Sequence, residues 1–410
     1  MHPGRVVIVG GGIGGLTVAA ALQAAGWEVV VCERAAESRE IAAGISLWPN
    51  AMRVLRRLDV SEAVQAAGSV ATGSRIRTWY GAPLGPCIVD GLEERFGAPL
   101  VGLHRAFLRG ILGSALDSRA LRLGAECVAV EPAGHGAVVH LADGGQEAGG
   151  VVVGADGTRS VVREALGSRE PLTYSGYVSM RGIVPLAADL AGRLPTGEWW
   201  GRGCLFGVAA LGGNQAYWWA SWRQPEGLVR ELEDDKRALL MRFRAWHDPI
   251  PELIDASMAE AIVHTPLYER PSAHRWADAA VVLVGDAAHP MLPALGQGAC
   301  QAIEDAAALA GALVEAPDVP TALGFYEQRR RQHAELVVRY ARRTAKLAHL
   351  ANPAAQAIRN VVFRTIGRTT VQSVLDQIIG RERSEVASDG GPAVPRKTGD
   401  ITDSTAPPGP

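Results

Sequence analysis

The sequence predicts an α/β protein in which a dinucleotide-binding domain is joined to a second, largely antiparallel domain and to helices at the C-terminal end. The first domain is indicated by an apolar run at residues 6–9 that breaks into glycines and resumes as a helical pattern. Aromatic-rich, strand-like segments at residues 174–222 indicate the second, and a helical pattern from about residue 318 to Ile379 indicates the C-terminal part. A chain of 410 residues is long enough for two or three domains.

The glycine-rich turn after residues 6–9 has the spacing of a dinucleotide-binding motif. Gly10, Gly12 and Gly15 fit G-x-G-x-x-G: the first permits the turn, the second lets the backbone approach a pyrophosphate, and the third lets the helix pack closely. A second apolar run, residues 29–31, is followed by Glu33 at the spacing of a βαβ unit, where a carboxylate holds ribose hydroxyls. The alternative is a glycine-rich turn of an ordinary α/β domain, but Glu33 favours an adenine dinucleotide.

The next segments are predicted to extend this domain and to leave it. Residues 39–50 are predicted to be a loop, in which Gly44 is either a cofactor contact or a loop glycine. Loose alternation at residues 75–89 predicts strands that leave the nucleotide domain. Residues 103–108 are predicted to open a helix, where Arg105 either reaches a diphosphate or is a solvated first-turn arginine.

Short strands are predicted at residues 127–131, 137–141 and 151–154, with a hairpin turn at residues 143–145. The last strand is followed by Asp156 between two glycines. Asp156 is either a helix N-cap or a ligand contact. We favour the ligand, because the chain is expected to return here to the sheet that ends at Gly10, and α/β folds bind ligands at this edge.

Strand alternation divides the aromatic residues of the second domain between two faces. Tyr217, Trp219 and Ser221 share one face, and residues 218, 220 and 222 share the other. One face is predicted to line a pocket and the other to pack in the core, although aromatic stripes in strands are also found wholly in cores. Residues 226–248 are predicted to form a charged amphipathic helix.

A second nucleotide signature follows. The apolar run at residues 279–284 ends at Asp286, and a Pro/Gly loop with Pro293 leads through residues 296–298 into a helix. Asp286 is expected to bind a sugar hydroxyl, and the N–H groups at the helix start are expected to face an anionic or electron-rich ring. His289 is predicted to be structural. From residue 381 the composition turns to Ser, Gly, Asp and Pro, so the tail is predicted to be disordered.

Composition excludes several classes of partner. A net charge of −2 gives no basis for binding nucleic acid or a membrane surface, and a small-molecule partner is the default expectation. The five cysteines form no C-x-x-C pair, which argues against a disulfide framework or a zinc site, so no metal is expected. The first strand begins close to Met1 and no apolar run approaches ~18 residues. A soluble, cytoplasmic protein is therefore predicted.

With both signatures placed, residues 5–345 resemble the single-component FAD-dependent monooxygenases of the aromatic hydroxylase type, such as salicylate, para-hydroxybenzoate, 3-hydroxybenzoate and urate hydroxylases and zeaxanthin epoxidase. Three motifs carry the resemblance in the family's order: the glycine turn with Glu33, Asp156-Gly157, and Gly285-Asp286. It implies a Rossmann-type FAD-binding domain interleaved with a mostly antiparallel substrate domain whose sheet covers the flavin. The expected domains are residues 1–75, 97–170 and 275–317 for FAD, 76–96 and 171–274 for substrate, 318–380 for C-terminal helices and 381–410 for a tail.

The resemblance also implies roles for individual residues. Glu33 is expected to bind the adenosine ribose, Arg105 the diphosphate, Asp156 both FAD and the incoming nicotinamide, and Asp286 the ribityl or diphosphate region. The full set of expected cofactor contacts is Gly10, Gly12, Ile13, Gly14, Gly15, Glu33, Arg34, Gly44, Ile45, Arg105, Asp156, Asp286, Pro293, Gly296, Gln297 and Gly298. NADH or NADPH is expected to dock transiently, because only one dinucleotide-binding unit is present.

The implied reaction uses NAD(P)H and O₂ to hydroxylate an aromatic small molecule through a flavin C4a-hydroperoxide. Tyr217 aligns with a substrate-facing tyrosine of some relatives, Arg181 or Arg202 is a candidate partner for an anionic substrate, and Pro293 is expected to border the reactive edge of the flavin. Packing or a surface salt bridge is the alternative for the first three. No residue is a convincing phenol base, and the aromatic-rich domain also suits a larger aromatic or prenylated substrate.

Three rival functions stay open at this point. The same cofactor chemistry serves alkene epoxidation or heteroatom oxidation, and no motif separates these from hydroxylation. A non-catalytic dinucleotide-fold binding protein is the remote alternative, against which the 293–298 loop argues. A flavin halogenase would need an early lysine and a W-x-W-x-I-P run, and the sequence has neither. A disulfide reductase would need a paired-cysteine motif, which is also absent from the sequence. A monomer or a homodimer is expected.

Overall fold

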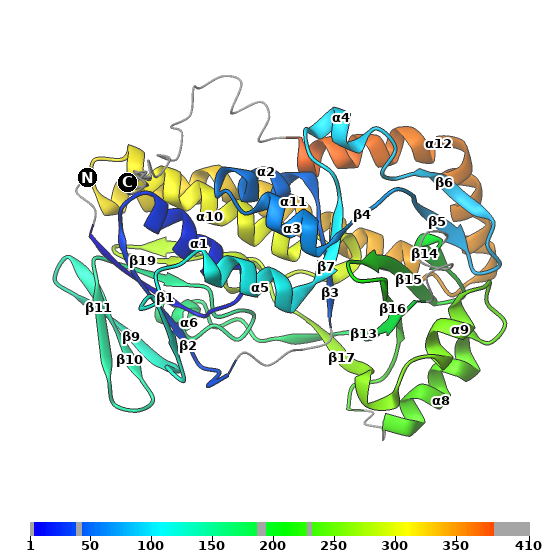
Figure 1. The fold of residues 1–410 in the computed structure, drawn as a ribbon, viewed down its shortest axis with the longest axis horizontal. Helices are drawn as coiled ribbons and strands as arrows, with labels where there is room; N and C mark the ends of the chain where they lie inside the picture. The colour runs from blue at the N-terminus through cyan, green and yellow to red at the C-terminus, as the bar shows by residue number, and fades with distance from the viewer. Residues whose placement is uncertain (1–3, 38–42, 187–193, 228–231, 381–410) are drawn as a thin grey trace, which may run out of the picture.

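The computed structural model describes residues 4–37, 43–186, 194–227 and 232–380. Two sheets lie toward opposite ends of an elongated molecule, and long helices run between them (Figure 1). The predicted fold class, an α/β protein with a second, mostly antiparallel sheet and C-terminal helices, is confirmed. The predicted disordered tail, residues 381–410, lies outside the described residues. Within the described part of the chain, every helix is too short or too polar to traverse a lipid bilayer.

The first sheet has six strands in the order β18-β19-β12-β1-β2-β8, and its central strands are parallel. Their valine-rich sequences are buried on both faces, as in parallel sheets that helices cover on two sides. The return of the chain from β12 to β1 is confirmed by their parallel pairing. The strands are β1 (Arg5–Val9), β2 (Glu28–Glu33), β8 (Leu121–Leu123), β12 (Val151–Gly154), β18 (Ala277–Asp278) and β19 (Val281–Leu283).

The glycine turn between β1 and α1 (Ile13–Ala24) admits no larger residue at two of its positions. Gly10 has a φ of +105°, and a Cβ there would lie 2.5 Å from the carbonyl oxygen of Ala155. A Cβ on Gly15 would lie 2.0 Å from the carbonyl oxygen of Gly10. The strand, the turn and the helix predicted from residues 6–15 are thereby confirmed, and the turn brings β1 against the residues that follow β12.

The second sheet has seven strands in the order β17-β13-β16-β15-β14-β5-β6, and all neighbours pair antiparallel except β5 and β14. Trp218, Ala220 and Trp222 pack into the core beneath it, against α8 (Leu232–Phe243) and α9 (Ile250–Asp255), while residues 217, 219 and 221 face a cavity. The predicted division of the two faces is confirmed. The strands are β5 (Ser74–Thr78), β6 (Pro83–Cys87), β13 (Thr173–Pro185), β14 (Thr196–Trp200), β15 (Cys204–Leu211), β16 (Gln215–Arg223) and β17 (Val263–Glu269).

Three local predictions are corrected. The predicted loop at residues 39–50 contains a strand, β3 (Gly44–Leu47), because β7 (Val101–His104) pairs with it antiparallel. The helix predicted to open at residue 103 is α5 (Arg105–Ser114), since residues 103 and 104 complete β7 and the His104 side chain caps the helix. The amphipathic helix predicted at residues 226–248 is α8 (Leu232–Phe243). The hairpin at residues 143–145 is confirmed and joins β10 (Gly136–Leu141) to β11 (Gln146–Gly149) beside β9 (Cys127–Ala133).

Long helices link the two sheets. The helix α10 (Gly298–Glu315) packs on α1 and on α11 (Val319–Ala348), and α12 (Pro353–Ile379) lies along the seven-stranded sheet at β6. The helical pattern predicted to end at Ile379 is confirmed, with one break where Asn352 caps α12. The other described elements are α2 (Pro49–Arg57), α3 (Ser61–Ala67), β4 (Ser69–Val70), α4 (Leu92–Phe96), α6 (Val161–Ala165), α9 (Ile250–Asp255), η1 (Ala259–Ala261), η2 (Gly285–Ala287) and η3 (Pro293–Leu295).

A buried ionic group on α10 holds three elements together. One oxygen of Asp305 accepts hydrogen bonds from the backbone N–H of Gly285 at 2.9 Å and from Nε2 of His289 at 2.6 Å, and the other accepts from Nε of Arg330 on α11 at 2.8 Å. Burial opposes ionisation of this carboxyl, but the charges and hydrogen bonds of His289 and Arg330 outweigh it and hold the pKa of Asp305 below its ordinary value. The structural role predicted for His289 is confirmed.

The first prediction concerns stability in acid. Because the folded-state pKa of Asp305 is depressed, its contribution is complete above the ordinary aspartate pKa of about 4 and is lost as the pH falls below that value. Asp305→Asn should lower the free energy of unfolding by about 3 kcal/mol at pH 7, since it removes one of the two carboxylates, Asp305 and Glu304, that pair with the buried Arg330. Urea unfolding of both proteins between pH 7 and pH 3 measures this.

The matched control is Asp278→Asn, which removes an exposed carboxylate paired with Arg275 and should change stability by less than about 1 kcal/mol. The difference between the parent and Asp305→Asn should shrink as the pH falls below about 4. A difference that stays constant down to pH 3 would contradict the assignment of the charge to Asp305.

Candidate active site

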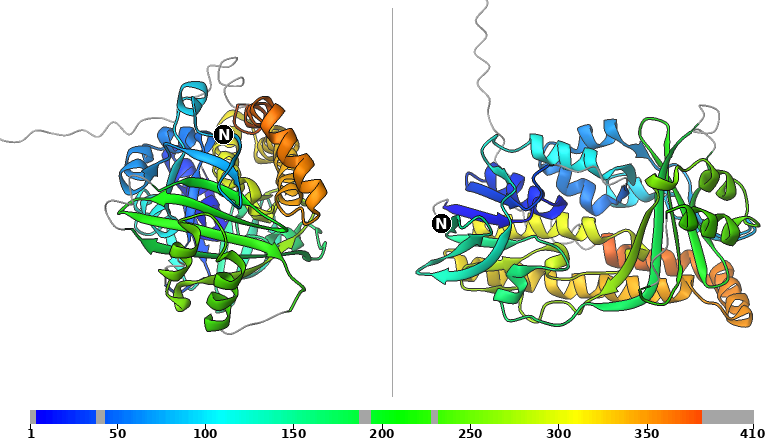
Figure 2. Two further views of the ribbon diagram at one scale, coloured as in Figure 1. Left: turned by 90° about the vertical axis from the view of Figure 1, so that its right-hand side faces the viewer. Right: turned by 90° about the horizontal axis from the view of Figure 1, so that it is seen from below.

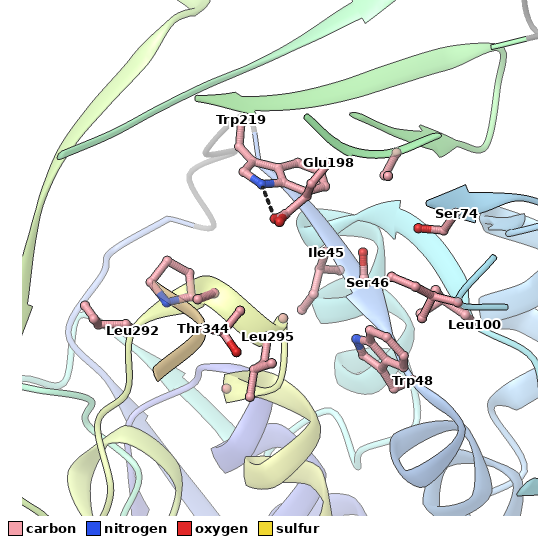
Figure 3. A pocket seen from close by; sticks show the side chains of 18 of the residues that line it. Ile45, Ser46, Trp48, Ser74, Leu100, Glu198, Trp219, Leu292, Leu295 and Thr344 are labelled. Carbon is pink, nitrogen blue, oxygen red and sulfur yellow. Dashed lines mark hydrogen bonds between the residues drawn. The ribbon is translucent and has the colours of Figure 1, made fainter. Parts of the chain in front are cut away.

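A cavity of about 1050 Å³ lies where the two sheets and the C-terminal helices meet. Its walls are the glycine turn and β3 on one side, the seven-stranded sheet on the second, and the loop before α10 with parts of α11 and α12 on the third. Figure 3 shows Glu198 and Trp219 pointing from the seven-stranded sheet toward the loop that carries Leu292 and Leu295. After the roles predicted for them, we call the part at the glycine turn and the α10 N-terminus the nucleotide end, and the part beneath the seven-stranded sheet the substrate end.

The carboxylate of Glu33 stands at the outer edge of the glycine turn. One oxygen accepts the backbone N–H of Gly11 at 2.7 Å, and the other accepts the N–H of Ala35 at 2.9 Å. These two bonds fix the side chain and leave further lone pairs for the hydroxyl groups of a ribose. The neighbouring residues Gly12, Ile13 and Gly14 line the cavity, and a Cβ on Gly12 would meet no atom within 4 Å.

Asp156 has one of the two roles considered for it, that of a helix cap, and its contact with a ligand stays a prediction. Its Oδ2 accepts the N–H groups of Val161 at 2.7 Å and Val162 at 3.3 Å, so it caps the first turn of α6. Its Oδ1 is buried and has no hydrogen-bond partner among the described residues. Burial raises the pKa of Asp156. The adjacent Gly157 lines the cavity, with open space where a Cβ would stand.

Asp286 projects into the cavity from the turn that follows β19. Gly285 has a φ of +59°, and its N–H is held by Asp305, so the direction of the next side chain is fixed by the buried ionic group. The Asp286 side chain is exposed to the cavity but surrounded by protein, and this burial raises its pKa, against the charges of His289 and Arg105. Arg105, at the start of α5, also lines the cavity.

The loop from Pro293 to the first residue of α10 closes this end of the cavity. Gly296 has a φ of +61°, and a Cβ there would lie 3.3 Å from Nε1 of Trp48. Gln297 is buried and accepts a hydrogen bond from Asn50 at 3.1 Å, which ties the loop to α2. Pro293, Gly296 and Gly298 line the cavity, so the positive end of the α10 dipole faces it.

These residues fit an FAD molecule. A glycine turn with open space at Gly12 gives room for a pyrophosphate beside a helix N-terminus. The fixed carboxylate of Glu33 follows at the sequence spacing that is typical of a ribose contact. The buried Oδ1 of Asp156 has an unused hydrogen-bonding capacity at the same edge of the sheet. The N-terminus of α10 offers N–H groups to the electron-rich end of a flavin. When bound, FAD supplies the activation of O₂ after reduction by NAD(P)H.

At the substrate end, one row of the seven-stranded sheet faces the cavity. Strand register places Arg181, Trp219, Gly207 and Glu198 side by side on β13, β16, β15 and β14. A Cβ on Gly207 would lie 2.0 Å from Cε2 of Trp219, so the indole ring lies across the glycine. It thereby reaches Glu198 two strands away, and its Nε1 donates to the Glu198 carboxylate at 3.1 Å.

Glu198 is the functional candidate that the sequence did not reveal. Its second carboxylate oxygen accepts the indole N–H of Trp200 at 2.8 Å, and the side chain lines the cavity. Burial raises the pKa of Glu198, although both indole hydrogen bonds favour the ionised form. The signal available in the sequence was a lone Glu-Trp-Trp run at residues 198–200, and only the pairing with β15 and β16 brings Trp219 to it.

Tyr217 and Arg181 lie side by side in the seven-stranded sheet on the side toward β3, which forms a small separate sheet with β7 and β4. A Cβ on Gly44 would lie 2.3 Å from Cγ of Tyr217, so β3 requires glycine at the point where the tyrosine crosses it. Burial raises the pKa of the Tyr217 hydroxyl, against the nearby guanidinium of Arg181. Arg181 also donates to the hydroxyl of Thr265 at 3.1 Å. Both side chains line the cavity. Their roles in substrate binding stay predictions.

The structure does not bring two predicted residues to the cavity. Arg202 is exposed in the turn between β14 and β15 and is not among the described residues that line the cavity. It lies beyond the end of β14, whereas Glu198, within the strand, faces inward, so the cavity gives no support to the suggested pairing of Arg202 with substrate, which stays a prediction. Arg34 is also exposed and lies outside the cavity, past the end of β2. The other predicted residues line the cavity or directly support its walls.

Comparisons with known proteins agree with this geometry. The model of the FAD binding domain family matches residues 4–341. The chain is 38% identical to "Aurachin C monooxygenase/isomerase" of Stigmatella aurantiaca over 368 residues, which is 90% of this chain and 96% of the relative. It is 37% identical to "3-amino-4-hydroxybenzoate 2-monooxygenase" of Streptomyces cremeus over 353 residues, 84% of this chain and 88% of the relative.

A solved structure shows the same fold. The crystal structure of Klebsiella pneumoniae HpxO complexed with FAD and uric acid superposes with a TM-score of 0.85 at 26% sequence identity. The match covers 92% of this chain and 96% of that one. The similarity therefore includes the glycine turn, the seven-stranded sheet and most of the C-terminal helices.

The second prediction tests the nucleotide end. Asp286→Ala should weaken FAD binding at least about tenfold, because a hydrogen bond to a charged group contributes about 1.5–3 kcal/mol. The measurement is the flavin absorbance per chain after dialysis at a fixed protein concentration. Asp278→Ala, also exposed but outside the cavity, is the matched control and should retain the parental flavin content. Equal flavin content in Asp286→Ala would refute the assignment.

Proposed function

The chain belongs to the FAD-binding-domain family of single-component monooxygenases and is an FAD- and NAD(P)H-dependent oxygenase, and we propose that it hydroxylates an uncharged aromatic ring that carries an apolar chain. The observation that carries the proposal is the composition of the cavity, which is polar beneath the seven-stranded sheet and apolar toward α12. The relatives named above support an aromatic substrate, since one of them is named for an amino-hydroxybenzoate.

The apolar arm is the part of the cavity that lies between β5–β6 and the C-terminal helices. Six of its lining residues are Ile88, Leu100, Phe363, Val371, Val374 and Leu375. A monocyclic acid held beneath Trp219 would leave this surface in contact with water. A substrate with an alkyl or prenyl chain would bury it, at roughly 25 cal/mol per Å² of apolar area. The arm therefore favours a substrate larger than a simple hydroxybenzoate.

The polar end favours a hydrogen-bond donor on the ring. The Glu198 carboxylate has lone pairs beyond those used by the two indoles, and it lines the cavity. A phenol O–H or a ring N–H fits this acceptor, whereas the carboxylate of a benzoate would be repelled by it. Its raised pKa also brings Glu198 closer to the value at which it exchanges a proton with a phenol near neutral pH.

The remaining residues orient the ring and keep water away. Tyr217 and Arg181 close the side of the cavity toward β3, and the Pro293 loop closes the side toward α10. A ring anchored at Glu198 lies between the seven-stranded sheet and the α10 N-terminus, where FAD fits. The proposed roles are therefore recognition of the ring donor by Glu198, and orientation by Tyr217, Arg181 and the Pro293 loop.

A series of phenols and indoles with and without a straight alkyl chain tests the proposal. Purified holoenzyme should consume NAD(P)H faster with the chain-bearing compounds, and mass spectrometry of the product should show one added oxygen on the ring. Oxygen on the chain of an alkenyl analogue would instead show epoxidation, which the apolar arm also accommodates. Preference for the unsubstituted or carboxylated rings would overturn the proposal.

The third prediction narrows the arm. Val374→Trp adds volume to a cavity wall, so kcat/KM for a chain-bearing substrate should fall at least about tenfold, while the value for the same ring without a chain should change less than about threefold. Ser373→Trp, the adjacent exposed position, is the matched control and should leave both values unchanged. Equal losses for both substrates would mean that the arm does not hold the chain.

The fourth prediction concerns the polar end. Glu198→Gln keeps one oxygen for an indole N–H but removes the charge, so KM for a phenol or indole should rise about tenfold, as expected for the loss of a charge-assisted hydrogen bond. Flavin content should be unchanged. Steady-state NAD(P)H consumption measures this, with Glu94→Gln, an exposed residue of α4, as the control. An unaltered KM for the phenol would remove Glu198 from substrate recognition.

A further inference from the structure

The outer face of α12 carries four large apolar side chains that are open to solvent. They form the apolar ridge, whose members are Ile358 (66% exposed), Val361 (58%), Val362 (42%) and Ile366 (55%). Spacings of three and four residues place them on one side of the helix. Figure 2 shows α12 on the outside of the molecule, beside α11. Surfaces of this kind mark contact sites for a membrane or a partner.

The stretch of chain that carries and precedes the ridge is basic, between Glu335 and Asp376. Residues 336–375 contain seven Arg and Lys and no Asp or Glu, although the whole chain has a net charge of −2. The exposed members of this set are Arg339, Arg343, Lys346, Arg364 and Arg368. Two of them, Arg364 and Arg368, lie about one and two helical turns beyond Val361, along the flank of the ridge. The surface is therefore complementary to an anionic partner.

The apolar arm of the cavity opens at the same surface. Leu347, Val362 and Ile366 are exposed, and all three also line the cavity. Leu347 lies in the last turn of α11, whereas Val362 and Ile366 lie on α12, so the opening lies between these helices. A chain that enters here meets Leu347, Val362 and Ile366 before the arm, although Arg343 and Thr370 of the same helices also lie in the cavity wall.

We propose that the apolar ridge and its flanking arginines dock on an anionic lipid surface, and that lipophilic substrate enters the apolar arm from that surface. Interfacial helices of this kind bury an apolar stripe at the headgroup boundary while basic side chains contact anionic headgroups. A second copy of the chain is the less favourable occupant, because a symmetric contact would bring two predominantly basic helix surfaces together. The docking on lipid does not depend on the proposed function. Only the entry of substrate from the lipid surface rests on the proposed function.

Co-sedimentation of the full-length holoenzyme with vesicles tests the docking. Binding should be strong for phosphatidylglycerol vesicles and weak for pure phosphatidylcholine vesicles, and it should decrease with added salt. Arg364→Glu with Arg368→Glu should weaken binding to phosphatidylglycerol more than about tenfold, at about fivefold for each basic charge removed. Ile358→Ser with Val361→Ser, neither of which lines the cavity, should weaken it about tenfold.

Met241→Ser is the matched control, since Met241 is 70% exposed on α8, away from the ridge, and its loss should leave vesicle binding unchanged. Flavin content and activity on a ring without a chain should be parental in all of these variants. Equal binding to both vesicle types, or unchanged binding by the ridge variants, would overturn the docking. So would a concentration-dependent dimer that Ile358→Ser with Val361→Ser dissolves, because a second copy would then cover the ridge.

Two further results separate this inference from the proposed function. Vesicle binding with the expected variant effects, in an enzyme that does not accept chain-bearing rings, would support the docking and refute the proposed substrate. Acceptance of chain-bearing rings without any vesicle binding would support the proposed substrate and refute the docking.

Discussion

The buried carboxylate of Asp305 is the contact on which the arrangement of the cofactor end depends. It binds α11 through Arg330, the turn after β19 through Gly285, and His289 beyond that turn. Because Asp305 itself lies on α10, the same contact fixes the N-terminus of that helix relative to Asp286. A second bond, between Tyr326 of α11 and the carbonyl of Leu283, holds the end of β19 from the other side. The cavity wall is thus positioned by groups that do not reach the cavity.

The shape of the substrate end depends on Gly207 of the seven-stranded sheet, which has no side chain. Gly207 lets the Trp219 ring lie flat across β15, and this brings an indole N–H to Glu198. Burying the Glu198 carboxyl group costs free energy, and the hydrogen bonds from the indoles of Trp200 and Trp219 offset that cost. These two bonds therefore allow a hydrogen-bond acceptor to be present in an enclosed site. The N-terminus of α10 turns backbone N–H groups toward the cavity, and the seven-stranded sheet turns the Glu198 carboxyl group toward it, so the two ends differ in chemistry.

The C-terminal helices give the site its length. The arm between the seven-stranded sheet and α12 is lined by aliphatic and aromatic side chains, and it opens where α12 carries its exposed ridge. The same two helices carry seven Arg and Lys over residues 336–375, although the net charge of the chain is close to zero. Composition averaged over 410 residues hides this, because the acidic residues lie elsewhere in the chain.

The sequence by itself determined the cofactor end. The spacing of three glycines, the acid that ends the second strand, and the acid after the strand at residues 281–283 are local patterns. The structure places Gly12 and Asp286 in the wall of one cavity and ties Glu33 to the glycine turn through Gly11. Alternation likewise predicted which aromatic residues of β16 pack and which face the cavity, since side chains in a strand point to opposite faces whatever the strand pairs with. Only the tertiary structure decided the substrate end. Strand order and register brought Glu198 to Trp219 and left Arg202 outside, and pairing with β7 made a strand of residues 44–47, because contacts between distant segments have no local signature in the sequence.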